Sequence, residues 1–453
     1  MFRRVLIANR GEIAVRVIRA CREMGINTIA VYSTADQECL HASLADESIC
    51  IGPPPPQESY LLIPSIIAAA EICDAQAIHP GYGFLSENAK FAGICRDCNI
   101  QFIGPSPEAI AMSGDKAACR QKVRAAGVPV VPGSDTIIKD AQEALQVAKT
   151  IGFPLLVKAA AGGGGKGMRL AHNDVALKNA LSLASAEAQA AFGDGGVYLE
   201  KFVEHARHVE FQILADHHGR VLTLGERECS IQRRHQKLIE ETPSMALNSS
   251  LRHKMSKAAI RAARAIGYSN AGTAEFLLAS DGQFYFIEFN ARIQVEHPVT
   301  EAVTGLDLVK EQIRIASGEP LGYSSVTPTG CAIEARIYAE DPEANFAPCP
   351  GVVGRCHLPG GPGLRVDTHL FSGYTVPRYY DSLLAKVIAW GRDRNEAINR
   401  LAGALDEVAT EGVKSTARLC ARIIRGDRFR RGDLGPDLIG EYVPKAKPDS
   451  VRP

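Results

Sequence analysis

Five polar residues alternate with apolar ones near the middle of the chain: Glu288, Asn290, Arg292, Gln294 and Glu296. In an extended backbone, residues two apart point to the same side, so these side chains would share one face. Carboxylate and amide oxygens suit a divalent metal, and a guanidinium suits an anion. Asparagine is a poor strand residue and the row has no lysine, serine or threonine. We therefore favour a chemical site over the solvent-facing side of an antiparallel strand.

A straight strand would not bring the two ends of this row into one small site. At a rise of about 3.3 Å per residue, Glu288 and Glu296 would lie more than roughly 20 Å apart. We therefore expect the strand to end after Asn290 and the chain to bend there into a catalytic loop.

Glu275 supplies a second carboxylate close to Glu288. The two residues lie in apolar segments that are joined by a short Ser-Asp-Gly turn at 280–282, which predicts a hairpin. Two facing carboxylates repel each other, so a metal, a proton or an arginine must lie between them. Together with Asn290 and phosphate oxygens, the pair would suit Mg²⁺.

A glycine-rich segment, GGGGKGMR at 162–169, follows an apolar strand that carries Lys158. The backbone N–H groups of such a loop can surround phosphate oxygens, although the pattern is not a Walker A loop. The alternative is a flexible linker. Lys158 needs an anion nearby or must extend to solvent, and Lys116, at a helix start, is either a phosphate ligand or a surface residue.

A basic cluster inside a neutral chain forms the remaining candidate. Arg233, Arg234 and Lys237 lie among glutamates between residues 226 and 241. The glutamates argue against nucleic acid, and a small anion such as bicarbonate or phosphate fits better. The alternative is a surface loop of salt bridges, which contributes little to stability.

The elements that must position these residues fall into three blocks. Alternating strands and helices up to about residue 110 predict a doubly wound parallel sheet, without the G-x-G-x-x-G pattern of a dinucleotide fold. We expect an α/β and α+β protein: an N-terminal α/β domain (1–112), an ATP-grasp region (113–325) with a mobile glycine-rich lid at about 131–203, a mixed α+β C-terminal domain (330–445) and a tail (446–453).

The composition excludes some classes of function. The 453 residues include 51 lysines plus arginines and 51 aspartates plus glutamates, so there is no basic surplus for nucleic acid. No apolar run approaches the roughly 18 residues of a membrane span. The twelve cysteines show no disulfide framework, which predicts a cytoplasmic location. Cys95 and Cys98 have helical spacing with their apolar neighbours, so we expect a helix core there rather than half a zinc site.

Several long motifs occur in one register between residues 2 and 445, and through them the chain resembles biotin carboxylase. They are NRGEIA (9–14), HPGYGFLSEN (79–88), the glycine-rich segment, ECSIQRR (228–234), RIQVEHPVTE (292–301), DP (341–342), YTVP (374–377) and YDS (380–382). The resemblance implies an ATP-grasp ligase that carboxylates biotin. Bicarbonate attacks the γ-phosphate of ATP to give carboxyphosphate, whose CO₂ is then captured by biotin.

The resemblance also implies a role for each site residue. The expected nucleotide contacts are Lys116, Lys158, Gly164, Gly165, Glu200, Lys201, Phe202, Val203, His208, Gln232 and His235. The expected ligands of Mg²⁺ or Mn²⁺ are Glu275, Glu288 and Asn290. Lys237, Arg292, Gln294 and Val295 would hold bicarbonate. Glu296 is the expected general base, and Arg336 would stabilise the biotin enolate.

The sequence contains no Met-Lys-Met biotinylation site, so biotin is expected on a separate biotin carboxyl carrier protein. The resemblance implies a homodimer working with carboxyltransferase subunits, most often as part of acetyl-CoA carboxylase in fatty acid synthesis. A pyruvate or propionyl-CoA carboxylase is the alternative. Two rival classes are an ATP-grasp ligase that forms amides through an acyl phosphate and a nucleotide-binding scaffold without activity.

Overall fold

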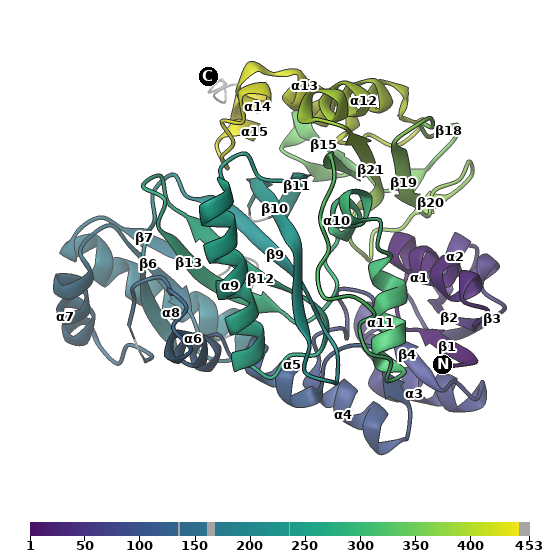
Figure 1. Cartoon of the computed structure of the whole chain (residues 1–453), viewed down its shortest axis with the longest axis horizontal. Coiled ribbons are helices and arrows are strands. Elements are labelled where there is room, and N and C mark those ends of the chain that lie inside the picture. Colours follow the sequence, from purple (N-terminus) through teal and green to yellow (C-terminus); the bar gives the residue numbers. More distant parts are fainter. Residues whose placement is uncertain (135, 161–167, 235, 444–453) are drawn as a thin grey trace, which may run out of the picture.

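The computed structural model describes residues 1–134, 136–160, 168–234 and 236–443. Within these ranges the chain builds a five-stranded, an eight-stranded and a three-stranded sheet, together with short two-stranded ribbons (Figure 1). The glycine-rich segment at 162–167 lies outside the described residues.

The N-terminal sheet is parallel, with strand order β3-β2-β1-β4-β5. Val5, Leu6 and Ile7 of the central strand are completely buried, as expected for a strand covered by helices on both faces. The predicted doubly wound sheet is therefore confirmed. Its elements are β1 (Arg4–Ile7), α1 (Gly11–Glu23), β2 (Asn27–Ser33), α2 (Leu40–Leu44), β3 (Glu47–Gly52), α3 (Ile63–Ile72), β4 (Ala77–His79), α4 (Ala89–Asp97), β5 (Gln101–Phe102) and α5 (Pro107–Gly114).

The large sheet is antiparallel, with strand order β13-β12-β9-β10-β11-β14-β21-β19. Its first five strands precede residue 291 and its last three follow residue 330, so the sheet crosses the predicted boundary at 325–330. The division into domains stays a prediction. The strands are β9 (Arg207–Ala215), β10 (Val221–Arg233), β11 (Gln236–Thr242), β12 (Asn270–Leu278), β13 (Phe284–Asn290), β14 (Cys331–Tyr338), β19 (Leu364–Thr368) and β21 (Leu383–Gly391).

Helices cover both ends of the large sheet (Figure 1). Helix α9 packs on β10 and β9, α10 on β14 and β10, and α12 on β21 and β14. The helices are α9 (Ser249–Ala265), α10 (His297–Thr304), α11 (Leu308–Ala316), α12 (Arg394–Glu407), α13 (Ala417–Arg425), α14 (Asp427–Arg431) and α15 (Leu438–Tyr442). The short ribbons are β15 (Glu340–Asp341) with β16 (Ala347–Pro348), β17 (Gly351–Val352) with β20 (Thr375–Val376), and β18 (Cys356–His357) with β22 (Ala409–Thr410).

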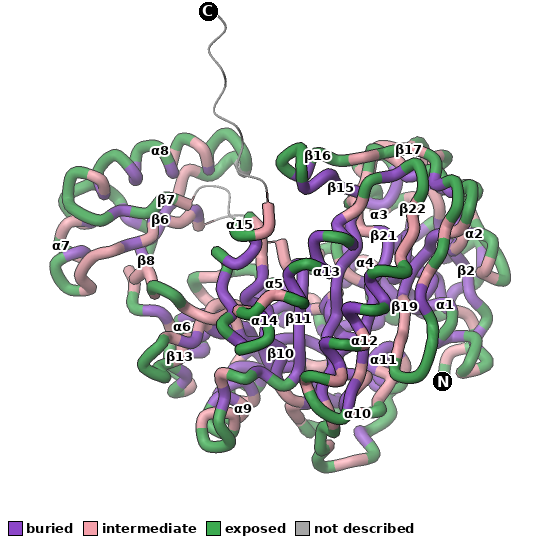
Figure 2. Tube along the Cα trace, turned by 90° about the horizontal axis from the view of Figure 1, so that it is seen from above, coloured by how far each residue is buried: buried purple, intermediate pink, exposed green. Residues whose placement is uncertain are grey.

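The three-stranded sheet, β7-β6-β8, forms a lobe beside the main body (Figure 2). Helices α7 and α8 pack on it and enclose a separate hydrophobic core that includes Leu155, Leu177 and Leu199. The elements of this region are α6 (Lys116–Ala125), α7 (Ala141–Ile151), β6 (Leu155–Ala159), β7 (Arg169–Ala171), α8 (Asp174–Phe192) and β8 (Val197–Lys201). The lobe lies within the predicted lid at about 131–203.

Two smaller expectations are also settled. Cys95 is buried within α4 and Cys98 ends that helix, which confirms the helix-core interpretation of this pair. Among the residues that the structure describes, none of the helices combines the length and apolar character needed to cross a membrane.

Candidate active site

One large cavity, of about 1860 Å³, collects most of the predicted site residues. Its walls come from the N-terminal sheet region, the lobe and the large sheet. The predicted residues that line it are Lys116, Lys158, Glu200, Lys201, Phe202, Val203, His208, Gln232, Lys237, Glu275, Glu288, Asn290, Arg292, Gln294, Val295 and Arg336. Gly164, Gly165 and His235 lie outside the described residues.

Lys237 on β11 is the centre of the buried part of the site. Its ammonium donates to Glu210 at 2.5 Å, to Glu296 at 2.6 Å and to Glu275 at 3.1 Å. Burial opposes the charge, but the three carboxylates outweigh it and hold the pKa of Lys237 well above its usual range. The lysine is therefore a permanent cation surrounded by anions.

Glu296 has cations on both of its oxygens. Lys237 contacts Oε1, and the guanidinium of Arg336 donates to Oε2 at 2.9 Å. Burial by itself would raise the pKa of Glu296, but Lys237 and Arg336 lower it well below its usual range. The carboxylate is completely buried and ionised at neutral pH, which is the first requirement of a general base.

Glu210 on β9 was not predicted from the sequence, although it completes this cluster. It lies opposite Glu275 in the β9–β12 register and accepts from Arg227 at 2.6 Å as well as from Lys237. Arg227 is fully buried. The alternation of His208, Glu210 and Gln212 along one strand was the available signal, because three polar residues at period two resemble the row at 288–296.

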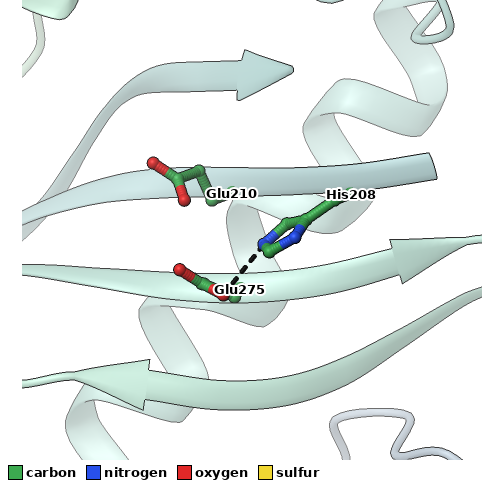
Figure 3. A group of neighbouring side chains, drawn as sticks. All are labelled: His208, Glu210 and Glu275. Carbon is green, nitrogen blue, oxygen red and sulfur yellow. Dashed lines mark ion pairs between the residues drawn. The ribbon is translucent and has the colours of Figure 1, made fainter. Parts of the chain in front are cut away.

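The β12–β13 hairpin brings the two predicted metal carboxylates together. Glu275 and Glu288 are directly opposite in the register, as the hairpin prediction required. Each has a separate cationic partner: His208 contacts Glu275 at 2.8 Å (Figure 3), and Lys116 contacts Glu288 at 3.0 Å. Asn290 donates to Glu275 at 2.9 Å.

The oxygen donors of this hairpin fit a hard divalent cation. Mg²⁺ prefers carboxylate and amide oxygens with phosphate oxygens completing its shell, and Glu275, Glu288 and Asn290 provide the protein part of that set. The ligand atoms of His208, Glu210 and Glu275 also lie within 4.8 Å of one another. Lys237 already contacts two of these three residues, so this second group is neutralised without an ion.

The loop at 291–296 confirms the predicted bend. Strand β13 ends at Asn290 and helix α10 begins at His297. Arg292 donates to Glu87 at 3.0 Å and to Gln294 at 2.8 Å, and Gln294 donates to Glu275 at 3.0 Å. Glu87 belongs to the HPGYGFLSEN motif, but sequence reasoning gave it no role.

The nucleotide end of the cavity lies against the lobe. Glu200 on β8 is ion-paired with both Lys158 and Arg120. Lys201 donates to the carbonyl oxygens of Gly152 and Phe153, at 3.2 and 2.6 Å. These contacts place Lys158 and the 200–203 segment on one wall of the cavity.

Gln232 and His208 link this wall to the hairpin. The side-chain amide of Gln232 lies 2.8 Å from His208 Nδ1. Burial acts against the imidazolium, but Glu275 outweighs it and raises the pKa of His208.

Arg336 is held by a second carboxylate that sequence reasoning also missed. Glu240 on β11 forms an ion pair with Arg336 at 2.5 Å and lies opposite Glu334 in the β11–β14 register. Burial raises the pKa of Glu240 to about 7, and it raises the pKa of Glu334 well above its usual range. Single glutamates in apolar strands carry no sequence signal of their own.

Three family models together match most of the chain. The descriptions are biotin carboxylase, N-terminal domain, for residues 1–110; carbamoyl-phosphate synthase L chain, ATP binding domain, for residues 115–324; and biotin carboxylase C-terminal domain, for residues 334–441.

Curated relatives match along almost their whole length. The chain is 56% identical over 442 residues to biotin carboxylase of Nostoc sp., which covers 97% of this chain and 99% of that protein. It is 51% identical over 444 residues to a pyruvate carboxylase subunit of Methanothermobacter thermautotrophicus, which covers 98% and 90%.

Solved structures agree with these matches. A biotin carboxylase–β-γ-ATP complex from Campylobacter jejuni has a TM-score of 0.95 at 47% identity, over 97% of this chain and 99% of that one. The biotin carboxylase domain dimer of Hydrogenobacter thermophilus 2-oxoglutarate carboxylase, in complex with MgADP, ADP and bicarbonate, has a TM-score of 0.94 at 47% identity, over 99% and 100%.

The fold and the cavity define an ATP-grasp enzyme, with a nucleotide wall on a separate lobe and paired carboxylates on the large sheet. Within that class the sequence matches are decisive. The chain belongs to the biotin carboxylase family.

Proposed function

We propose that this chain catalyses the ATP- and bicarbonate-dependent carboxylation of biotin on a biotin carboxyl carrier protein. The observation that carries the proposal is the position of Glu296, a buried and ionised carboxylate between Lys237 and Arg336, at the end of the Arg292 loop. An anion pocket with a base at its edge suits bicarbonate.

The nucleotide end supplies positioning and charge neutralisation, which are the main requirements of phosphoryl transfer. Lys116 and Lys158 face the same cavity as Glu288, so we assign them to the phosphates. Glu275, Glu288 and Asn290 would hold Mg²⁺, which neutralises phosphate charge when bound. The lobe would cover the phosphates and keep water from a labile intermediate.

The bicarbonate end performs the proton transfer. Lys237 and Arg292 hold the bicarbonate anion, and Glu296 accepts its proton as the oxygen attacks the γ-phosphate of ATP. Carboxyphosphate and ADP result. Carboxyphosphate then breaks into CO₂ and phosphate, and deprotonated N1 of biotin captures the CO₂. Arg336 stabilises the negative charge on the ureido oxygen of that biotin anion.

The carrier protein, the carboxyltransferase subunits and a homodimer complete the proposal. The Hydrogenobacter relative is a dimer, which supports the last of these. All twelve cysteines are free thiols, which supports a cytoplasmic location. We retain acetyl-CoA carboxylase as the predicted context. Relatives named after pyruvate and 2-oxoglutarate carboxylases keep a different acyl acceptor as the alternative.

The test is ADP release measured with bicarbonate, with and without free biotin. We expect release to depend on bicarbonate and to increase when biotin is added, together with formation of carboxybiotin. An ATP-grasp ligase of the amide-forming type has no use for biotin. Release that ignores biotin would reject the proposal.

A further inference from the structure

Lys386 on β21 is a fully buried lysine to which neither the sequence nor the proposed chemistry assigns a role. A buried ammonium is costly unless anions and hydrogen-bond acceptors surround it. Its Nζ donates to the carbonyl oxygen of Val295 at 2.9 Å and lies 3.1 Å from Glu12 and 3.9 Å from Asp367. The charge is thus satisfied by three oxygens.

These three oxygens belong to three distant parts of the fold. Val295 is in the loop between β13 and α10, Glu12 is in the first turn of α1, and Asp367 is the cross-strand neighbour of Lys386 on β19. Lys386 also faces Arg336 across the β14–β21 pair. One ammonium therefore ties the N-terminal sheet region and the strands after residue 330 to the loop.

The loop depends on such ties because it lies outside the sheet ladders. At its start, Glu87 accepts from the backbone N–H of Ala291 and from Arg292, at 2.9 and 3.0 Å. At its end, Lys386 holds the Val295 carbonyl, which belongs to the peptide that leads into Glu296. If that peptide turns, the Glu296 carboxylate moves away from Lys237.

Asp367 and Glu12 keep Lys386 in place from two sides. Burial alone would raise the pKa of Asp367, but Arg365 and Lys386 lower it to about 2, so this carboxylate is ionised. Glu12 accepts a hydrogen bond from the Tyr82 hydroxyl, and both residues line the cavity. The ammonium is consequently fixed before any substrate binds.

We infer that Lys386 is a positioning residue for bicarbonate: by holding the Val295 carbonyl it sets the placement of Arg292 and Glu296 against the anion. The inference rests on the proposed function. Because the lysine touches the loop and not the nucleotide wall, its loss should alter bicarbonate use and leave nucleotide use nearly unchanged.

The experiment compares Lys386→Met with wild-type enzyme and with Lys414→Met. Lys414 forms an exposed pair with Asp341 and serves as the matched lysine control. For Lys386→Met we expect KM for bicarbonate to increase on the order of 10- to 100-fold, as misplacement of a catalytic loop commonly costs. KM for ATP should stay within about twofold of wild type by the same reasoning. Lys414→Met should match wild type in both constants.

Lys386→Arg covers the case in which Lys386→Met does not fold. A guanidinium keeps the charge but has a planar donor arrangement, so it cannot reproduce the same three contacts. We expect a folded protein that still shows a selective increase in KM for bicarbonate.

Two results would overturn the inference: unchanged KM for bicarbonate in a folded variant, or equal changes in both KM values. A wild-type enzyme without bicarbonate-dependent ADP release would instead reject the proposed function.

Discussion

The two ends of the cavity differ in how their charges are held. Around Lys237, three carboxylates and an ammonium are buried in the large sheet and touch one another directly. At the nucleotide end, Lys116 and Glu288 form a pair whose side chains are 30% and 31% exposed. The first group is built into the sheet, and the second lies at a cavity wall.

The difference indicates which end is formed before the substrates bind. Buried charges in mutual contact cannot rearrange cheaply, because each would lose its partner in a medium of low polarity. The exposed Lys116–Glu288 pair can separate at little cost, and each member can then meet a phosphate or a metal. The bicarbonate end is thus preorganised, while the nucleotide end exchanges partners.

Lys237→Met tests the preorganised end most severely. It leaves Glu210, Glu275 and Glu296 together without their ammonium, so we expect a loss of about 3–5 kcal/mol in the free energy of unfolding. Carboxylation should fall at least about 1000-fold. Denaturant unfolding and carboxybiotin formation measure the two effects.

Lys158→Met is the control at the nucleotide end. Arg120 still neutralises Glu200 in that variant, so its stability should fall much less. Equal stability of the two variants would contradict the comparison.

Glu296→Gln separates chemistry from nucleotide binding. The amide keeps the shape but cannot take a proton, so we expect carboxylation to fall about 10²- to 10⁴-fold. Calorimetric binding of ATP should be nearly unchanged, because Glu296 belongs to the buried end. An unaltered bicarbonate-dependent rate would remove Glu296 from the role of base.

Lys116→Met probes the end that exchanges partners. Loss of the lysine should weaken MgATP binding by about tenfold, the effect of removing one charge-assisted contact. The free energy of unfolding should change by less than about 1 kcal/mol, because the pair is partly exposed. Nucleotide titration and thermal unfolding check this. A large loss of stability would show that this end is also built in.

Glu240→Gln tests the buried end through pH. The pKa of Glu240 is raised from 4.5 to about 7 by burial. Between these values the folded protein keeps a proton that the unfolded chain has released, so this group lowers stability as pH rises. The variant should lose a slope of up to about 1.4 kcal/mol per pH unit in this window. Unfolding followed from pH 5 to 8 measures the slope, and an unchanged slope would contradict the assignment.

Local patterns in the sequence predict the preorganised end only in part. The period of two and the short turn were enough to predict the Glu275–Glu288 pairing and the bend after Asn290, because both depend on neighbouring residues. Glu210 and Lys386 were missed because their importance comes from the order of distant strands. That order, β13-β12-β9-β10-β11-β14-β21-β19, brings together residues separated by more than a hundred positions.

The continuous large sheet also limits how this protein can be divided. The family models end at residue 324 and resume at 334, yet β11 and β14 pair directly across that interval. A fragment ending before β14 would expose the whole edge of β11, and a fragment starting there would expose the edge of β14. Exposed edges recruit other chains, so separately expressed halves should associate or aggregate. The chain is modular in its sequence families but indivisible as a folding unit at this point.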